Sequence, residues 1–246
     1  MPVGFRAITA AGVVQIDENH LCLSLRAKGA AAASNAHAMS IGSTWLLRYH
    51  DLTFTSADAP IVALRVTEAN QYAGVIAVTR SGNVWTFRIL VIGQATNSFQ
   101  FQYWIFDRPS APSGSGFGLI VRDAANRIVF NSNDPVIRVV GQAPGDYGSG
   151  RTYAFAYSSV INYFHEIVDN TPTGWLTLES IQAWGCRATP TGVQRALQTV
   201  YGNVLNGDAP PQFAPGSGLN GWGGGDVNYG FAPAEMSMLV LDVTGI

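Results

Sequence analysis

The sequence predicts an all-β protein built from two tandem, duplicated β-sandwich modules. Three observations lead to this fold class: short apolar segments recur about every ten residues, the composition is poor in helix formers, and a phrase near the N-terminus returns in the middle of the chain. Among the 246 residues there are 27 glycines, only 12% are charged, and Lys28 is the single lysine. Such a composition favours strands and turns over helices.

The repeated phrase joins residues 3–25, VGFRAITAAGVVQIDENHLCLSL, to residues 117–140, FGLIVRDAANRIVFNSNDPVIRVV. A gapless alignment matches identical residues, namely Gly4 with Gly118, Ala10 with Ala124, Ala11 with Ala125 and Asn19 with Asn133. The apolar pattern agrees more widely, with Val14 and Ile16 on Ile128 and Phe130, and Leu23 and Leu25 on Ile137 and Val139. The chain therefore contains one unit twice.

The first unit opens with a predicted hairpin, in which GFRAIT and VVQI flank a turn at residues 10–12. Residues 21–27 alternate apolar and polar residues, which predicts a strand with one buried face. The small, weakly patterned residues 29–38 are interpreted as a loop. Five strand-like segments follow, at residues 43–54, 60–67, 72–79, 83–92 and 99–107, and this regular spacing is typical of a sandwich or barrel.

A Pro/Ser/Gly-rich segment, residues 108–116, has the composition of a linker and lies where the repeat restarts. The second unit then predicts the same hairpin, with Asn126 in place of Gly12 at a position where the backbone is left-handed. Strand-like segments follow at residues 151–159, 161–169 and 173–185. The closing segments FQYWIFD and MSMLVLD also correspond, so that Asp107 aligns with Asp242. Both closing segments are expected to be strands that are buried on both faces.

These matches predict a first module at residues 1–111 and a second at residues 112–246. The second unit is longer by about 21 residues, which predicts an insertion at about residues 187–233. Its first part, residues 192–205, spaces apolar residues as an amphipathic helix would. Its second part is Gly/Pro-rich and carries four scattered aromatic residues, Phe213, Trp222, Tyr229 and Phe231.

The four aromatic residues are the candidate interface or ligand residues. A long loop without periodicity is seldom idle in a compact domain, so a contact surface on a partner is one interpretation and a plain surface excursion is the other. Trp222 lies among glycines, where little local structure can bury it. It could stack on a sugar ring or anchor a protein interface, and interfaces enrich Trp and Tyr.

The sequence carries no complete motif for catalysis, a metal or a cofactor. The glycines of GSGLNG, residues 216–221, lack the strand and helix that a dinucleotide site requires, and HEIVD, residues 165–169, has Asp169 where a zinc helix needs a second histidine. The histidines are dispersed, and the charges of RYHD and FDRP are explained by surface ion pairs or turns. We therefore expect no catalytic residue, no metal site, no cofactor and no enzymatic activity, although a carboxylate pair assembled in space would not show in the sequence.

Charge and hydropathy bound the partners. The formal net charge of −2 argues against a surface that neutralises nucleic acid, and the apolar runs are too short to cross a bilayer. The N-terminus lacks the pattern of a signal peptide, and two cysteines, Cys22 and Cys186, are too few for a disulfide framework. These features predict a soluble protein made in the cytoplasm, with its thiols outside any disulfide.

Two phrases, GLIVRDAANRIVFNSNDPVIRVVG and QYWIFDRPSAPSGSGFGLIV, resemble structural proteins of tailed bacteriophages and prophages that have long non-contractile tails. Such proteins carry a GLxVxNAxGxxxFDS-like hairpin and a YxVFDxP-like strand. Here the first motif matches at Gly118, Val121, Ala124, Phe130 and Ser132, and the second at Tyr103, Phe106, Asp107 and Pro109. The N-terminal copy is looser.

The resemblance implies a virion protein of the tail tip or the base of a tail fibre, built from β-sandwich modules and made in the host bacterial cytoplasm. The expected partners are a tail-tip hub, a fibre and further copies of the chain in a symmetric assembly, with a trimer favoured. The alternative is a carbohydrate-binding module that is displayed on the tail and recognises a host surface glycan; this rests on the fold analogy alone.

Overall fold

The structure is a computed structural model that describes residues 6–8, 14–17, 21–36, 45–111, 118–157, 161–171, 174–207 and 238–246. None of these residues lies in a helix, and every strand pairing is antiparallel. The predicted all-β class is therefore confirmed for the part of the chain that the structure describes.

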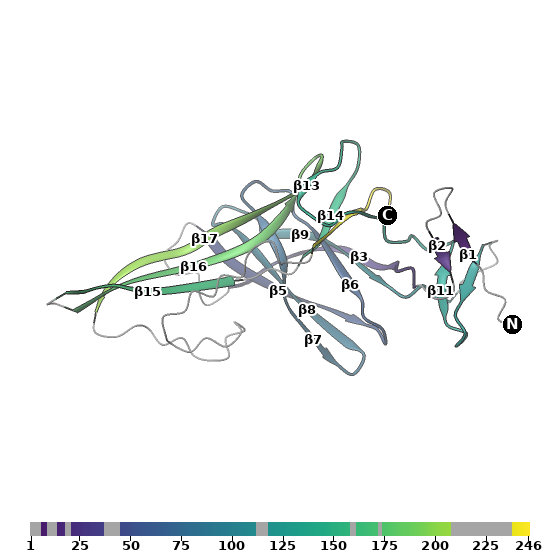
Figure 1. Cartoon of the computed structure of the whole chain (residues 1–246), viewed down its shortest axis with the longest axis horizontal. Helices are drawn as coiled ribbons and strands as arrows, with labels where there is room; N and C mark the ends of the chain where they lie inside the picture. The colour runs from purple at the N-terminus through teal and green to yellow at the C-terminus, as the bar shows by residue number, and fades with distance from the viewer. Residues whose placement is uncertain are drawn as a thin grey trace.

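Two main sheets build the body of the molecule (Figure 1). The six-stranded sheet has the order β12 (Val139–Gly141), β18 (Met238–Asp242), β14 (Tyr153–Tyr157), β6 (Ile61–Arg65), β9 (Gln100–Asp107), β3 (Ser24–Ala32). The eight-stranded sheet has the order β13 (Gly145–Asp146), β17 (Gly192–Gly207), β16 (Gly174–Ala188), β7 (Tyr72–Ser81), β8 (Val84–Gln94), β5 (Trp45–Thr55), β4 (Asn35–Ala36), with β15 (Ile161–Thr171) also beside β16.

The main core lies between these two sheets. One cluster of buried residues contains Leu64, Phe101, Ile105, Phe155 and Val240 from the six-stranded sheet, together with Leu52, Ala73, Phe87, Ile89, Val91, Cys186 and Val193 from the eight-stranded sheet. Alternate residues of each strand point to this cluster, as the two-residue period of a strand requires. Two layers with a shared apolar interior are consistent with a β-sandwich.

Both sheets combine strands from the two expected modules. Phe155 of β14 pairs with Leu64 of β6, and Cys186 of β16 pairs with Ala73 of β7. The residues before and after residue 111 therefore share two sheets and one core, a contact that the predicted pair of modules joined by a linker did not include. The boundary between residues 1–111 and 112–246 itself stays a prediction.

The start of the predicted linker is fixed to both units. Arg108 donates two hydrogen bonds to the carboxylate of Asp58, at 2.8 and 3.0 Å, and the backbone N–H of Ser110 donates to Asp134 at 3.0 Å. Pro109 is buried. Residues 108–111 are therefore held by contacts, and residues 112–117 lie outside the described residues.

The two predicted hairpins are confirmed. β1 (Arg6–Ile8) pairs with β2 (Val14–Asp17), and β10 (Ile120–Arg122) pairs with β11 (Ile128–Asn131), each as a two-stranded sheet. The registers correspond throughout: the pairs Arg6–Asp17, Ala7–Ile16 and Ile8–Val14 align with Ile120–Asn131, Val121–Phe130 and Arg122–Ile128. Both hairpins shift register at the same step, so even the irregularity is repeated.

The turn of the second hairpin has the predicted backbone. Asn126 has a φ of 62°, in the left-handed region that asparagine tolerates better than most residues. The carboxylate of Asp123 accepts hydrogen bonds from the backbone N–H groups of Ala125 and Arg127, which closes the turn.

The strand-like segments from residue 43 to residue 107 are confirmed as β5 to β9, and those of the second unit as β14 to β16 and β18. Two predictions were wrong. Within the predicted loop 29–38, residues 29–32 continue β3 and residues 35–36 form β4. The alanines have a weak propensity for strands, but pairing with β9 and packing of the Tyr103 ring against Gly29 outweigh it. Residues 192–205 form strand β17 instead of a helix, because pairing along β16 outweighs the helical spacing of their apolar residues.

We expect Phe155→Ala to lower the free energy of unfolding by about 3–5 kcal/mol, because Phe155 is fully buried where the strands of the two units meet. Urea denaturation measures this change. The control is Val78→Ala on β7, since Val78 is 50% exposed and should change stability by less than about 0.5 kcal/mol. Equal effects of the two substitutions would contradict the assigned core.

Candidate functional site

The four aromatic residues that the sequence proposed as an interface, Phe213, Trp222, Tyr229 and Phe231, lie outside the described residues. Of the predicted insertion at residues 187–233, the structure describes residues 187–207. These form the end of β16, the turn to β17, and β17 itself. The structure therefore places the beginning of the insertion in the eight-stranded sheet and leaves the candidate aromatic residues as a prediction.

The described histidines and cysteines belong to different segments of the fold. His50 of β5 lies edge-on to the ring of Phe101, with 5.7 Å between ring centroids, and His165 belongs to β15. His20 and His37 lie outside the described residues. Within the described residues, no three histidine, cysteine, aspartate or glutamate residues are grouped as a metal site would need.

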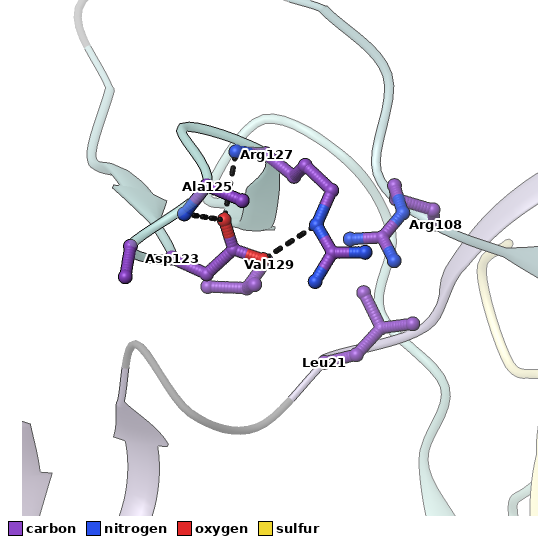
Figure 2. A pocket seen from close by; sticks show the side chains of 7 residues that line it. Leu21, Arg108, Asp123, Ala125, Arg127 and Val129 are labelled. Atoms are coloured by element: carbon purple, nitrogen blue, oxygen red, sulfur yellow. Dashed lines mark hydrogen bonds and ion pairs between the residues drawn. The ribbon is translucent and has the colours of Figure 1, made fainter.

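A pocket of about 340 Å³ lies where the first unit ends and the second hairpin begins (Figure 2). We call it the junction pocket; its lining residues are Leu21, Arg108, Asp123, Ala124, Ala125, Arg127 and Val129. Figure 2 shows the guanidinium groups of Arg108 and Arg127 next to each other, with Leu21 beside them. The described residues of the lining include no histidine, cysteine, serine or tyrosine, so these residues supply no nucleophile with an adjacent base.

Both arginines of the junction pocket are paired with carboxylates. Arg127 donates to Asp123 at 2.7 Å, while Arg108 holds Asp58 through two nitrogens and also donates to the backbone carbonyl of Ile128 at 3.2 Å. Arg108 therefore joins the loop before β6 to the second hairpin. The sequence analysis interpreted the charges of FDRP as a surface ion pair or a turn, and the partner of Arg108 in the structure is Asp58, fifty residues away.

The second charged motif, RYHD, is also resolved into contacts across strands. Asp51 of β5 accepts two hydrogen bonds from Arg88 of β8, both at 2.8 Å. Arg48 lies over the ring of Phe99, at 4.6 Å from its centroid. These charges therefore support the surface of the sheet.

Arg127 leaves hydrogen-bond donors available in the junction pocket. The side chain of Arg127 is 62% exposed, and its terminal nitrogens donate to no acceptor among the described residues. A guanidinium group in this position can receive a carbonyl or carboxylate oxygen, with Leu21 and Val129 as apolar neighbours. No local pattern in the sequence could have indicated this site, because its lining residues come from three separate segments, at Leu21, at Arg108 and at residues 123–129.

The sequence predicted that the two cysteines form no disulfide, and the structure agrees. Cys186 is fully buried between the sheets, with its Sγ 3.6 Å from the Sδ of Met238. Burial raises the pKa of the Cys186 thiol to about 12 and also raises the pKa of the nearby Tyr157 hydroxyl. Both groups are therefore neutral at physiological pH and act as packing residues.

A three-stranded arm, formed by β15, β16 and β17, reaches beyond the body of the molecule (Figure 1). β16 has 15 residues and β17 has 16, and a strand of this length spans roughly 50 Å. Among the described strands, the arm pairs with the body at one end, where Cys186 of β16 pairs with Ala73 of β7 and Val193 of β17 pairs with Gly145 of β13. The two hairpins lie at the opposite end of the molecule from this arm (Figure 1).

None of the family models, curated proteins and solved structures with which the chain was compared matches it. Over the described residues, no helix is long and apolar enough to cross a membrane.

We expect the pair between Arg108 and Asp58 to make stability depend on pH in the acid range. The hydrogen bonds from Arg108 lower the pKa of Asp58 below its ordinary value of 3.8, so the pair stabilises the fold above that value, and this contribution is lost as the pH falls through the lowered pKa. Asp58→Asn should remove a contribution of on the order of 1 kcal/mol or less, since the pair is partly exposed.

Unfolding in urea at a series of pH values measures this effect. Asp51→Asn is the matched comparison, because Arg88 holds the Asp51 carboxylate in the same way and also lowers its pKa. Parallel stability–pH curves for the parent protein and Asp58→Asn would show that the pair does not act as described.

We expect the Cys186 thiol to react with a thiol reagent at least roughly 100-fold more slowly in the native protein than in urea, because burial keeps it protonated and covered. The measurement uses a Cys22→Ser background, so that a single thiol is counted. Rapid reaction in the native state would mean that the two sheets do not enclose this residue.

Proposed function

We propose that the protein is a structural component of a bacteriophage tail of the long non-contractile kind, at the tail tip or the base of a tail fibre. It acts by protein–protein docking in a symmetric assembly of the virion, for which a trimer of this chain is favoured. The proposal begins from the resemblance of its two phrases to such tail proteins. The all-β fold with two main sheets agrees with the β-sandwich modules that the resemblance implies.

The two resembling motifs are in contact in the fold. The first forms hairpin β10–β11, and the second forms the end of β9 and continues to Pro109. Arg108, within the second motif, donates a hydrogen bond to the carbonyl of Ile128 in the first. The motifs therefore make one structural unit, which supports a shared role in building the fold and in presenting the hairpin.

The three-stranded arm is the feature that best supports a docking role. Among the described strands, β15 pairs only with β16, so its other edge presents backbone N–H and C=O groups that can pair with a further strand. A strand edge of this kind is a common binding surface for an extended segment of a partner protein. An arm that reaches beyond the body can contact a neighbouring subunit without displacing the body's own packing.

We also propose that the chain arose by tandem duplication of one module. The correspondence of the hairpin registers supports this, and so does the pairing of the closing strands. Val139 and Gly141 of β12 face Leu241 and Val240 of β18, as Leu25 and Ala27 of β3 face Phe106 and Ile105 of β9. In each pair of strands one residue is skipped at the same place, which chance similarity of two strands would not produce.

We expect Leu178→Pro to reduce binding to purified tails or tail-tip complexes roughly tenfold or more, a change of about 1.4 kcal/mol or above. Residue 178 lies in the middle strand of the arm and pairs with Glu166 of β15 and Val204 of β17, so proline interrupts a ladder there. Co-sedimentation with tails measures binding. Leu178→Val is the control, because it keeps the backbone donor.

The body should remain folded in Leu178→Pro, and thermal unfolding checks this. A parent protein that is a lone monomer and is absent from purified virions would contradict the proposal.

The insertion is tested separately with Trp222→Ala. Loss of binding to bacterial cells with an unchanged oligomeric state would favour glycan recognition over assembly as the role of that segment.

A further inference from the structure

The two units meet along strands that correspond to each other in the repeat. β6 and β14 are equivalent because they face the closing strands in the same register: Ile61 lies opposite Phe106 of β9, and Ala154 lies opposite Leu241 of β18. The order of the six-stranded sheet, β12-β18-β14-β6-β9-β3, is therefore the same when it is followed from either end. Its midpoint is the antiparallel contact between β14 and β6.

The register at this midpoint obeys a two-fold axis. Because Leu64 pairs with Phe155 in an antiparallel ladder, Ala63 lies opposite Ala156. These two alanines are also equivalent in the repeat, since each lies two residues after the matched pair Ile61 and Ala154. An equivalent residue must face its own counterpart where a two-fold axis crosses a ladder, and this condition is met.

A second contact between the units obeys the same rule. Ser24 forms an antiparallel bridge with Val136, so Leu23 lies opposite Ile137, its counterpart in the repeated phrase. The backbone N–H of Ile137 donates to the carbonyl of Leu23 at 2.9 Å. Two separate segments of the chain therefore place equivalent residues face to face.

We infer that the chain is a fused dimer, in which the two units are held by a self-complementary interface of the kind that forms between identical subunits related by a two-fold axis. Continuous sheets and a shared core form this interface, and the covalent connection through residues 108–117 is not what holds the units together. Leu64 and Phe155 are both fully buried at the interface. The partner that fits this surface of each unit is the other unit.

The two-fold arrangement also determines how many copies of each surface one chain has. The hairpin occurs twice, as β1–β2 and β10–β11, whereas the arm of β15, β16 and the outer part of β17 belongs to the second unit. Contacts made by the arm therefore have one copy per chain. This conclusion does not depend on the assignment to a phage tail.

The test is to insert a specific protease site between Ala111 and Pro112 of the full chain and to cut the folded protein to completion. We expect the two pieces to remain a one-to-one complex by native mass spectrometry. The thermal midpoint of the cut protein should fall with each tenfold dilution, because unfolding now separates two molecules, while the uncut protein should show no dependence on concentration. Separate elution of two folded pieces would overturn the inference, as would a midpoint that does not change on dilution.

Matched variants in the cut protein show where the pieces adhere. Leu64→Ala removes a buried leucine at the two-fold contact, and Leu52→Ala removes a buried leucine from β5, away from the ladder between β6 and β14. Leu64→Ala should raise the dissociation constant of the pieces at least tenfold more than Leu52→Ala does. Equal effects would overturn the assignment of the interface. Absence of the chain from virions would disprove the tail proposal and leave this result unaffected.

Discussion

The fold depends on the antiparallel contact between β6 and β14, where Leu64 faces Phe155. This contact makes one six-stranded sheet from two sets of three strands, and both side chains enter the core shared with the eight-stranded sheet. A three-stranded set by itself would have a further exposed edge and half of the apolar interior, and small sandwiches with little core are only marginally stable. Joining the sets removes two edges and increases the buried apolar area at the same time.

The two units share their backbone pairing but differ in their polar residues. In the second unit, the Asp242 carboxylate is partly desolvated, but hydrogen bonds from Thr244 and the charges of Arg138 and Arg151 outweigh this and lower its pKa. In the first unit, Ser24 occupies the position of Arg138, and the Oδ1 of the buried Asp107 has no partner among the described residues. Register is thus held by the ladder and the core, which tolerate such changes better than a buried charge network does.

The two ends of the molecule differ in kind. Two equivalent hairpins lie at one end, with the junction pocket and its paired arginines beside the second hairpin, and a long arm of single copy lies at the other (Figure 1). The pair between Arg108 and Asp58 anchors the connection between the units to the loop before β6, while Asp123, the partner of Arg127, closes the turn of the second hairpin. In the tail assembly that we propose, the two ends would contact different neighbours, with the sandwich as the spacer between them.

The sequence alone determined the all-β class, the two hairpins, the left-handed Asn126 of the second hairpin, and the place of most strands. Alternating apolar residues and turn-forming residues are local signals, so these features can be predicted without the tertiary structure. It could not predict that residues 29–32 and 192–205 are strands, because pairing with β9 and β16 is decided by distant partners that outweigh weak or misleading local patterns. Nor could it show that the two units share their sheets, or that Arg108 holds Asp58 at the junction pocket. The shared sheets arise where β6 meets β14 and β7 meets β16, whereas the pair between Arg108 and Asp58 lies within the first unit. In both cases, pairing and packing between segments far apart in the chain leave no periodic trace in either segment.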